Sequence, residues 1–181
     1  YHGARKETIQ PFDFAVKEGE TIGVIGGTGS GKSTFVSLIA RLYDVTSGRI
    51  LYRGVDEKEL KPEFIRGKIG FVPQKASLFE GSLRDNMKWG KEDATDEEIY
   101  QALDIAQARE FVDQKEQRLD FRIEQNGGNL SGGQKQRLTI ARASVRKPEI
   151  LILDDSASAL DFATDARLRK AIKENTDNMT V

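Results

Sequence analysis

Short apolar runs separated by polar, glycine-containing turns recur along this chain, and three of them predict strands. They cover residues 21–25, residues 68–72, which Pro73 stops, and residues 150–153. The last run, Ile-Leu-Ile-Leu, is apolar at every position, which is typical of a central parallel strand covered on both faces. We therefore expect an α/β protein with a mostly parallel central sheet.

Two weaker patterns predict an antiparallel β edge beside that sheet. Residues 12–16 (Phe-Asp-Phe-Ala-Val) alternate between apolar and polar positions, as an edge strand does. Residues 49–52 form a further expected strand, which follows a turn at residues 46–48.

Helical patterns occupy the rest of the chain. Expected helices cover residues 35–42, 135–143 and 161–175, and another begins at Thr95, where acidic residues fill the first turn and Ile99, Leu103 and Ala106 form an apolar stripe. From about residue 82 to residue 144 the chain is mostly helical. We interpret residues 82–144 as a helical subdomain inserted into an α/β core of residues 1–81 and 145–181, within one domain.

Composition narrows the class of protein. The 181 residues suffice for one domain, and 38% hydrophobic with 31% charged residues indicate a folded core. The net charge of −1 disfavours a nucleic-acid partner, and the absence of cysteine excludes disulfides and thiolate metal sites.

The chain opens without methionine and closes on a β-prone run at residues 179–181, so we expect the C-terminal end of the domain to be missing.

Residues 26–34 (Gly-Gly-Thr-Gly-Ser-Gly-Lys-Ser-Thr) predict a phosphate-binding loop. Its glycines let backbone N–H groups converge on one point, and the expected helix after it adds the positive end of its dipole. Lys32 can reach the outer phosphates, and the Ser33 hydroxyl can bind Mg²⁺. The alternative is an ordinary glycine-rich turn, which the flanking strand and helix disfavour.

Two carboxylates follow the apolar run at residues 150–153. Because ligands bind at the carboxyl ends of strands in open α/β sheets, we expect Asp154 to hold Mg²⁺ beside Ser33. Asp155 could polarise an attacking water. The alternative for this pair is a helix cap or a turn.

A second glycine-rich turn, Ser131-Gly132-Gly133-Gln134, opens the expected helix at residue 135 and predicts another anion site. Alternatively Ser131 is an ordinary N-cap, and both roles can hold together. One triphosphate does not need two such turns. This one is therefore expected to serve a nucleotide held by another subunit.

These motifs together resemble the nucleotide-binding domain of ATP-binding cassette (ABC) transporters. The resemblance rests on the phosphate loop, residues 71–74, the turn at 130–134, residues 150–155 and residues 158–161, in the family's order over nearly the whole chain. Residues 77–86 and 129–142 resemble the exporter branch in particular. The resemblance implies a P-loop NTPase fold, ATP and Mg²⁺ as cofactors, and head-to-tail pairing of two domains. Its implied place is the cytoplasmic face of the cell membrane, beside a transmembrane domain.

The resemblance also implies residue roles. Catalysis would fall to Asp155, Gln74 and Lys32, and the metal would be held by Ser33, Gln74 and Asp154. Gln74 would also sense the transmembrane partner, and Asp161 would lie at the dimer seam. Tyr1 would stack on adenine, unless it is a frayed terminus. The phosphates would contact Gly27, Thr28, Gly29, Ser30, Gly31, Lys32, Ser33 and Thr34. The opposite subunit would contribute Ser131, Gly132, Gly133 and Gln134 to the nucleotide site. We expect His2 to lie in a solvated loop and Trp89 to pack in the helical subdomain.

Asp155 departs from the family pattern, which normally has glutamate there. A shortened base together with an intact turn at residues 130–134, the family's signature motif, resembles one half of a heterodimeric exporter whose own ATP site is slow. The alternative is a homodimer in which aspartate is an adequate base.

Two other functions are possible for the motifs. One is an ATP-binding module with vestigial hydrolysis, and the other is a DNA-repair or chromosome-organising ATPase, whose long coiled coil has no counterpart in this sequence. We expect the isolated chain to be inactive. The transported substrate is not predictable from these residues.

Overall fold

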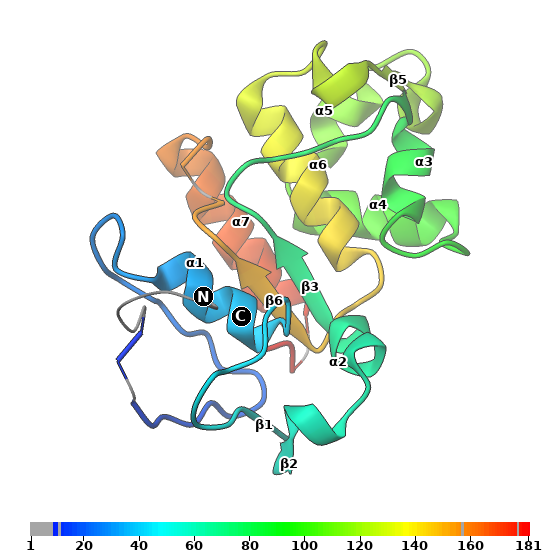
Figure 1. Ribbon diagram of the computed structural model, residues 1–181. Coiled ribbons are helices and arrows are strands. Elements are labelled where there is room, and N and C mark those ends of the chain that lie inside the picture. Colours follow the sequence, from blue (N-terminus) through cyan, green and yellow to red (C-terminus); the bar gives the residue numbers. More distant parts are fainter. Residues whose placement is uncertain (1–8, 11, 157, 177) are drawn as a thin grey trace.

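A parallel pair of strands lies at the centre of the computed structural model, which describes residues 9–10, 12–156, 158–176 and 178–181. Strand β3 (Ile69–Val72) pairs with β6 (Ile150–Leu153) in register, from Ile69 opposite Ile150 to Val72 opposite Leu153 (Figure 1). Both strands were expected from their apolar runs. The prediction of a parallel central sheet is confirmed.

The sheet continues beyond β6 through single backbone contacts. Ile150 forms a parallel bridge with Thr180. Val181 in turn donates its N–H to the carbonyl of Glu20 at 3.0 Å and accepts from the N–H of Ile22 at 2.8 Å. These bonds place residues 20–22, just before the phosphate loop, on the far side of the 180–181 segment.

The expected buried strand at residues 21–25 is not formed. The structure describes all five residues, assigns no strand to them and leaves them exposed, with Ile25 at 98% of its full accessibility. Among the described residues, Val181 is the neighbour whose backbone bonds to this segment. A single pairing residue does not build a ladder, so within the described chain these apolar residues form no strand.

An antiparallel hairpin flanks the sheet. It consists of β1 (Leu51–Tyr52) and β2 (Val55–Asp56), joined by Arg53 and Gly54, which both have positive φ, as tight hairpin turns require. The expected antiparallel edge is therefore present in this hairpin. It does not include residues 12–16: there Phe12 and Phe14 pack on the ring of Phe35, with centroids 5.5 and 5.7 Å apart, in an irregular segment.

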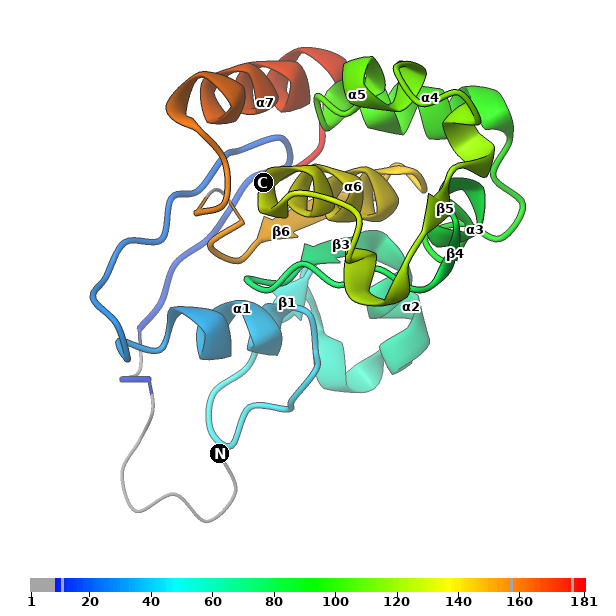
Figure 2. The same ribbon diagram turned by 90° about the horizontal axis from the view of Figure 1, so that it is seen from above.

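Helices cover both faces of the sheet, as Figure 2 shows. On one face, α1 (Lys32–Ile39) and α2 (Pro62–Lys68) share a cluster with Ile69 and Ile152. On the other, α6 (Gly132–Ser144) and α7 (Phe162–Asn175) share a larger cluster with Val72 and Leu151. Because neighbouring strand residues point to opposite faces, both faces of β6 are buried. Helix α1 begins three residues before the expected helix.

Most of the remaining helices lie between residues 82 and 144. They are α3 (Leu83–Lys88), α4 (Asp96–Ile105), α5 (Arg109–Asp113) and the short helices η2 (Arg118–Asp120) and η3 (Gln125–Gly127). The same region contains an antiparallel strand pair, β4 (Gly81–Ser82) with β5 (Arg122–Ile123). A further short helix, η1 (Glu57–Glu59), lies outside this region. Thr95 caps α4, and its expected apolar stripe is buried. The boundaries of a separate subdomain stay a prediction.

Gly90, after α3, lies against the backbone of α6. A Cβ at this position would fall 2.1 Å from the carbonyl oxygen of Arg142 and 2.7 Å from Cγ1 of Val145. We expect Gly90→Ala to lower the free energy of unfolding by about 1–3 kcal/mol, because the two helices must move apart. The midpoint of urea unfolding measures this. Gly67→Ala is the matched control: its Cβ would meet no atom within 4 Å, and equal midpoints for the two variants would contradict the prediction.

Candidate functional site

The phosphate loop is a tight turn that only glycine can form at several positions. Gly29 and Gly31 have φ of 79° and 93°, in the left-handed region. A Cβ on Gly26 would lie 2.5 Å from Oγ of Ser30, so the loop folds closely on itself. Gly31 is the N-cap of α1 and has no side chain to cap it. The first N–H groups of α1 are therefore suited to an external anion.

The ammonium group of Lys32 lies over this loop. Its Nζ donates to the carbonyl oxygens of Gly26 at 2.7 Å and Gly27 at 2.9 Å. Lys32 is the first residue of α1, so the helix fixes its position at the loop. A positive charge is thus already held where phosphate is expected to bind.

A hydroxyl and a carboxylate meet between α1 and the end of β6. Ser33 Oγ donates to Oδ1 of Asp154 at 3.1 Å, and the N–H of Asp154 donates to the carbonyl of Val72 at 2.9 Å. The parallel pairing of β3 and β6 therefore positions the Asp154 carboxylate beside α1. The sequence predicted that Asp154 would lie beside Ser33. Oxygen groups of this kind suit Mg²⁺.

The rest of a metal's coordination would have to come from elsewhere. Over residues 9–10, 12–156, 158–176 and 178–181, no three histidine, cysteine, aspartate or glutamate side chains gather in a way that could hold a metal ion. Mg²⁺ is commonly bound by one or two protein oxygens together with substrate phosphates and waters. The Ser33–Asp154 pair fits that mode, in which the nucleotide supplies part of the shell.

Gln74 and Asp155 form a second pair beside the first. Gln74 Nε2 donates to Oδ2 of Asp155 at 2.9 Å. Gln74 follows β3 and Asp155 follows β6, so their contact is a consequence of strands that end at the same edge. Asp155 has a φ of 48°, an uncommon conformation of the kind found at functional sites.

The glycine-rich turn at residues 131–134 begins α6 with a capping box. Ser131 Oγ accepts from the N–H of Gln134 at 3.2 Å, and the N–H of Ser131 donates to Oε1 of Gln134 at 3.0 Å. The N-cap alternative for Ser131 is thereby confirmed as local geometry, and it leaves anion binding open. A Cβ on Gly133 would lie 3.2 Å from the carbonyl oxygen of Ala159, so this turn packs on the loop after Asp155.

Asp161 uses its side chain to cap α7. It accepts from the N–H of Thr164 at 2.9 Å and from Oγ1 of Thr164 at 2.7 Å. These hydrogen bonds hold the pKa of the Asp161 carboxyl below its usual range. Its expected place at a dimer seam stays a prediction.

The two glycine-rich turns lie apart within this chain. In Figures 1 and 2 the start of α6 is well separated from the start of α1. The structure thus brings together the phosphate loop, Gln74, Asp154 and Asp155, and leaves the turn at residues 131–134 outside that group. Tyr1 and His2 fall outside the described residues.

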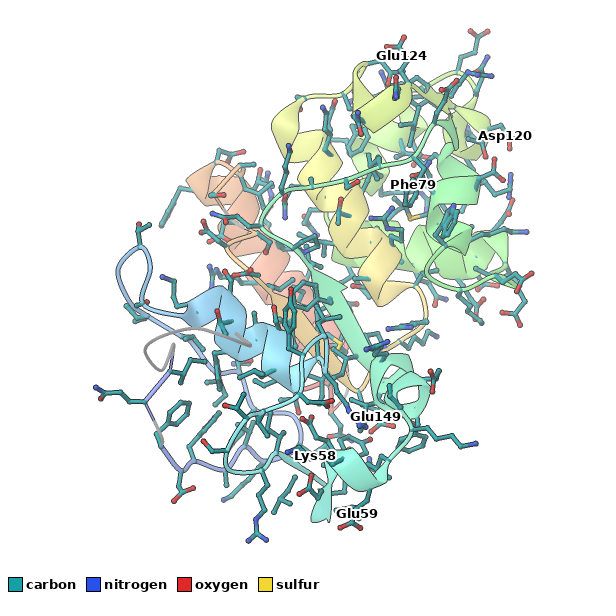
Figure 3. All side chains as sticks on the ribbon, viewed as in Figure 1. Lys58, Glu59, Phe79, Asp120, Glu124 and Glu149 are labelled. Carbon is teal, nitrogen blue, oxygen red and sulfur yellow. The ribbon has the colours of Figure 1, made fainter. Side chains whose placement is uncertain are left out.

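A groove lined by aromatic and arginine side chains was not anticipated from the sequence. It has a volume of about 390 Å³ and lies between β3, α6, the C-terminal ends of α1 and α2, and residues 89–90, which follow α3. Trp89 is 70% exposed at its edge and stacks on Phe79, with centroids 4.8 Å apart; the prediction that Trp89 packs inside the helical subdomain is wrong. Phe79, labelled in Figure 3, is held beside α3 by Asn86, whose Oδ1 accepts from its N–H at 2.9 Å. The next residue, Gly90, lies against the backbone of α6, and Trp89 is left at the surface beside this contact.

Comparison with known proteins gives consistent matches. A family model described as ABC transporter matches residues 9–158. The chain is 48% identical over 170 residues to the uncharacterized ABC transporter ATP-binding protein YfiB of Bacillus subtilis (strain 168), covering 92% of this chain and 29% of that protein. It is 41% identical over 180 residues to the probable multidrug resistance ABC transporter ATP-binding/permease protein YheI of the same strain, covering 99% and 31%.

A solved structure gives the same result. The structure of a bacterial Atm1-family ABC exporter with ATP bound superposes with a TM-score of 0.92 at 32% identity, covering 98% of this chain and 31% of that one. The chain thus spans less than a third of the length of these proteins. Within the part of this chain that the structure describes, no helix combines the length and apolar character needed to cross a membrane. From its motifs, its site and these matches, this chain belongs to the ABC transporter family, as an ATP-binding domain with the family's P-loop fold.

Proposed function

We propose that this chain binds and hydrolyses ATP to power export by an ABC transporter. The observation that carries the proposal is one cluster: Ser33 meets Asp154 at 3.1 Å, and Gln74 meets Asp155 at 2.9 Å, at the strand ends beside the phosphate loop. A phosphate-binding loop, a metal-binding oxygen pair and a candidate base then share one edge of the sheet. That is the set of groups that attack of water on a γ-phosphate requires.

Each group has a defined task in this proposal. The loop amides and Lys32 bind the β- and γ-phosphates, and Ser33 and Asp154 hold Mg²⁺, which neutralises charge on the phosphate oxygens when bound. Asp155 orients the attacking water and takes its proton, while Gln74 positions Asp155 through the hydrogen bond already present. These residues supply positioning and charge, the main sources of catalysis in phosphoryl transfer.

The site is completed by a second domain. The Ser131 turn lies away from this chain's own phosphate loop. Head-to-tail pairing would place it on the nucleotide held by a partner ATP-binding domain, either a second copy or the other half of a heterodimer. The exposed N-terminus of α6 is suited to that anion.

A second candidate function is an ATP-binding module whose own hydrolysis is vestigial. Asp155 favours it, because aspartate is one methylene shorter than the glutamate usual in the family, and its Oδ2 is already engaged by Gln74. ATP would then act mainly as a bridge between the two domains.

The transmembrane partner is proposed to dock on the aromatic groove. Phe79 and Trp89 are 47% and 70% exposed. Neighbouring large apolar rings that are exposed to water often mark a surface that a partner covers. Arg142 lies over the Phe79 ring at 5.5 Å and donates to the carbonyl of Ser77 at 2.7 Å. Residues 77–79 follow Gln74 closely, so docking there could be transmitted to the site. We propose that the docked domain lies on the cytoplasmic face of the membrane.

The composite site is tested by a variant of the Ser131 turn. In the purified transporter, this chain and its partner carry different tags, and a photoactivatable ATP analogue labels whichever chain's phosphate loop retains it. We expect Ser131→Arg in this chain to reduce labelling of the partner by at least about tenfold, because a side chain then fills the γ-phosphate position. Labelling of this chain should stay within about twofold of its original value. Loss confined to this chain would contradict head-to-tail pairing.

A further inference from the structure

Arg137 connects the start of α6 to a neighbouring turn. Its Nη1 donates to the carbonyl oxygen of Gln107 at 2.6 Å, and its Nε donates to the carbonyl oxygen of Gly133 at 3.4 Å. The guanidinium also lies 5.0 Å from the ring centroid of Phe111, in α5. One side chain therefore contacts the first turn of α6, the end of α4 and the face of α5.

The anchor at Gln107 is a rigid one. Gln107 has a φ of 56° and donates its N–H to the carbonyl of Asp104 at 3.0 Å, while the N–H of Ala108 donates to the carbonyl of Leu103 at 2.7 Å. This is the left-handed ending that closes many helices. The alanines on either side of Gln107 are fully buried. The carbonyl that receives Arg137 is thus fixed in place by the end of α4.

The other contact of Arg137 lies within the glycine-rich turn at residues 131–134, which we call the signature turn. Gly133 lies between Ser131 and Gln134, which form the capping box, and a Cβ on Gly133 would lie 3.2 Å from the carbonyl oxygen of Ala159. Burial lowers the pKa of the Arg137 guanidinium, and the nearby carboxylate of Asp161 opposes part of that shift. The turn is therefore held from behind by Arg137 and from the side by the loop before α7.

We infer that Arg137 is a positioning residue for the nucleotide bound by the partner domain. It fixes the orientation of the signature turn relative to α4 and α5 without touching nucleotide itself. Only a forked donor spans two carbonyls in different directions and also stacks on a ring, which explains arginine rather than lysine here. This inference rests on the proposed function, because it needs the turn to act on the partner's ATP.

The test uses the same two-tag transporter and the same photoactivatable ATP analogue. Arg137→Met keeps the apolar stem and removes both hydrogen bonds. We expect labelling of the partner chain to fall by about tenfold or more, because a misplaced turn no longer meets its phosphate. Labelling of this chain should stay within about twofold, because its own phosphate loop is unchanged. Arg137→Lys, which keeps the charge but not the fork, should show the same asymmetry more weakly and serves if the methionine variant does not fold.

Two comparisons separate the possible failures. Arg169→Met is the matched control, because Arg169 is an exposed residue of α7 paired with Asp165 at 2.8 Å, and it should alter neither chain's labelling. Equal losses on both chains with Arg137→Met, or no loss on either, would overturn the inference and leave Arg137 a packing residue. If Ser131→Arg also fails to act on the partner, the proposed composite site is wrong instead.

Discussion

Lys32→Ala is expected to lower ATP hydrolysis at this chain's site by about 100- to 1,000-fold, the effect of removing one well-placed charged donor from a transition state. The ammonium already lies over the loop, 2.7 and 2.9 Å from the carbonyl oxygens of Gly26 and Gly27. An incoming γ-phosphate would replace these neutral partners with a charged one, a stronger hydrogen bond. Phosphate release by the purified transporter measures the rate.

The matched control is Lys170→Ala on α7. Lys170 is exposed and paired with Glu174 at 3.8 Å, a surface contact with little energetic weight. Its loss should leave the hydrolysis rate unchanged. A Lys32→Ala transporter that keeps more than half of the original rate at this site would show that the loop does not hold the reacting phosphates.

Asp155→Glu is expected to raise single-turnover hydrolysis at this chain's site by about 10- to 100-fold. The added methylene moves the carboxylate about 1 Å further from the backbone, and a displacement of that size can change a rate by about 100-fold. The rate is measured with the partner's phosphate loop disabled, so that this site alone is observed.

The neighbouring carboxylate supplies the control for side-chain length. Asp154→Glu makes the same chemical change but disturbs the 3.1 Å contact with Ser33, so hydrolysis should fall rather than rise. If Asp155→Glu leaves the rate unchanged or lowers it, aspartate is an adequate base and the heterodimer interpretation loses its support. If both variants are as slow as the original, the ATP-binding module is the better account.

Features governed by neighbouring residues were predictable from the sequence. The cap of α4 at Thr95, the box between Ser131 and Gln134 and the cap of α7 at Asp161 each depend on a bond across three residues. Strands β3 and β6 were predictable because burial on both faces demands a continuous apolar run.

The outcomes that differed depend on partners distant in the sequence. Residues 21–25 have a strand-like pattern, but within the part of the chain that the structure describes their backbone bonds to Val181 and builds no ladder. In residues 12–16, Phe12 and Phe14 pack on Phe35 and no strand is formed. Trp89 is exposed and stacks on Phe79, while the next residue, Gly90, lies against the backbone of α6. The local sequence pattern does not predict these outcomes, because they depend on which distant segments pack or pair with each strand-like segment.

For the site, the sequence by itself determined the chemical groups: a glycine-rich loop with Lys32, two carboxylates after a strand, and a second glycine-rich turn. The rule that ligands bind at strand ends also led us to expect Ser33 beside Asp154, 121 residues away, whereas only the tertiary structure decided that Gln74 donates to Asp155 across 81 residues. It also decided that the second turn stays apart, tied to α4 through Arg137. The physical reason is that local hydrogen bonds specify turns and caps, whereas contacts between distant segments form only when the sheet and its covering helices pack together.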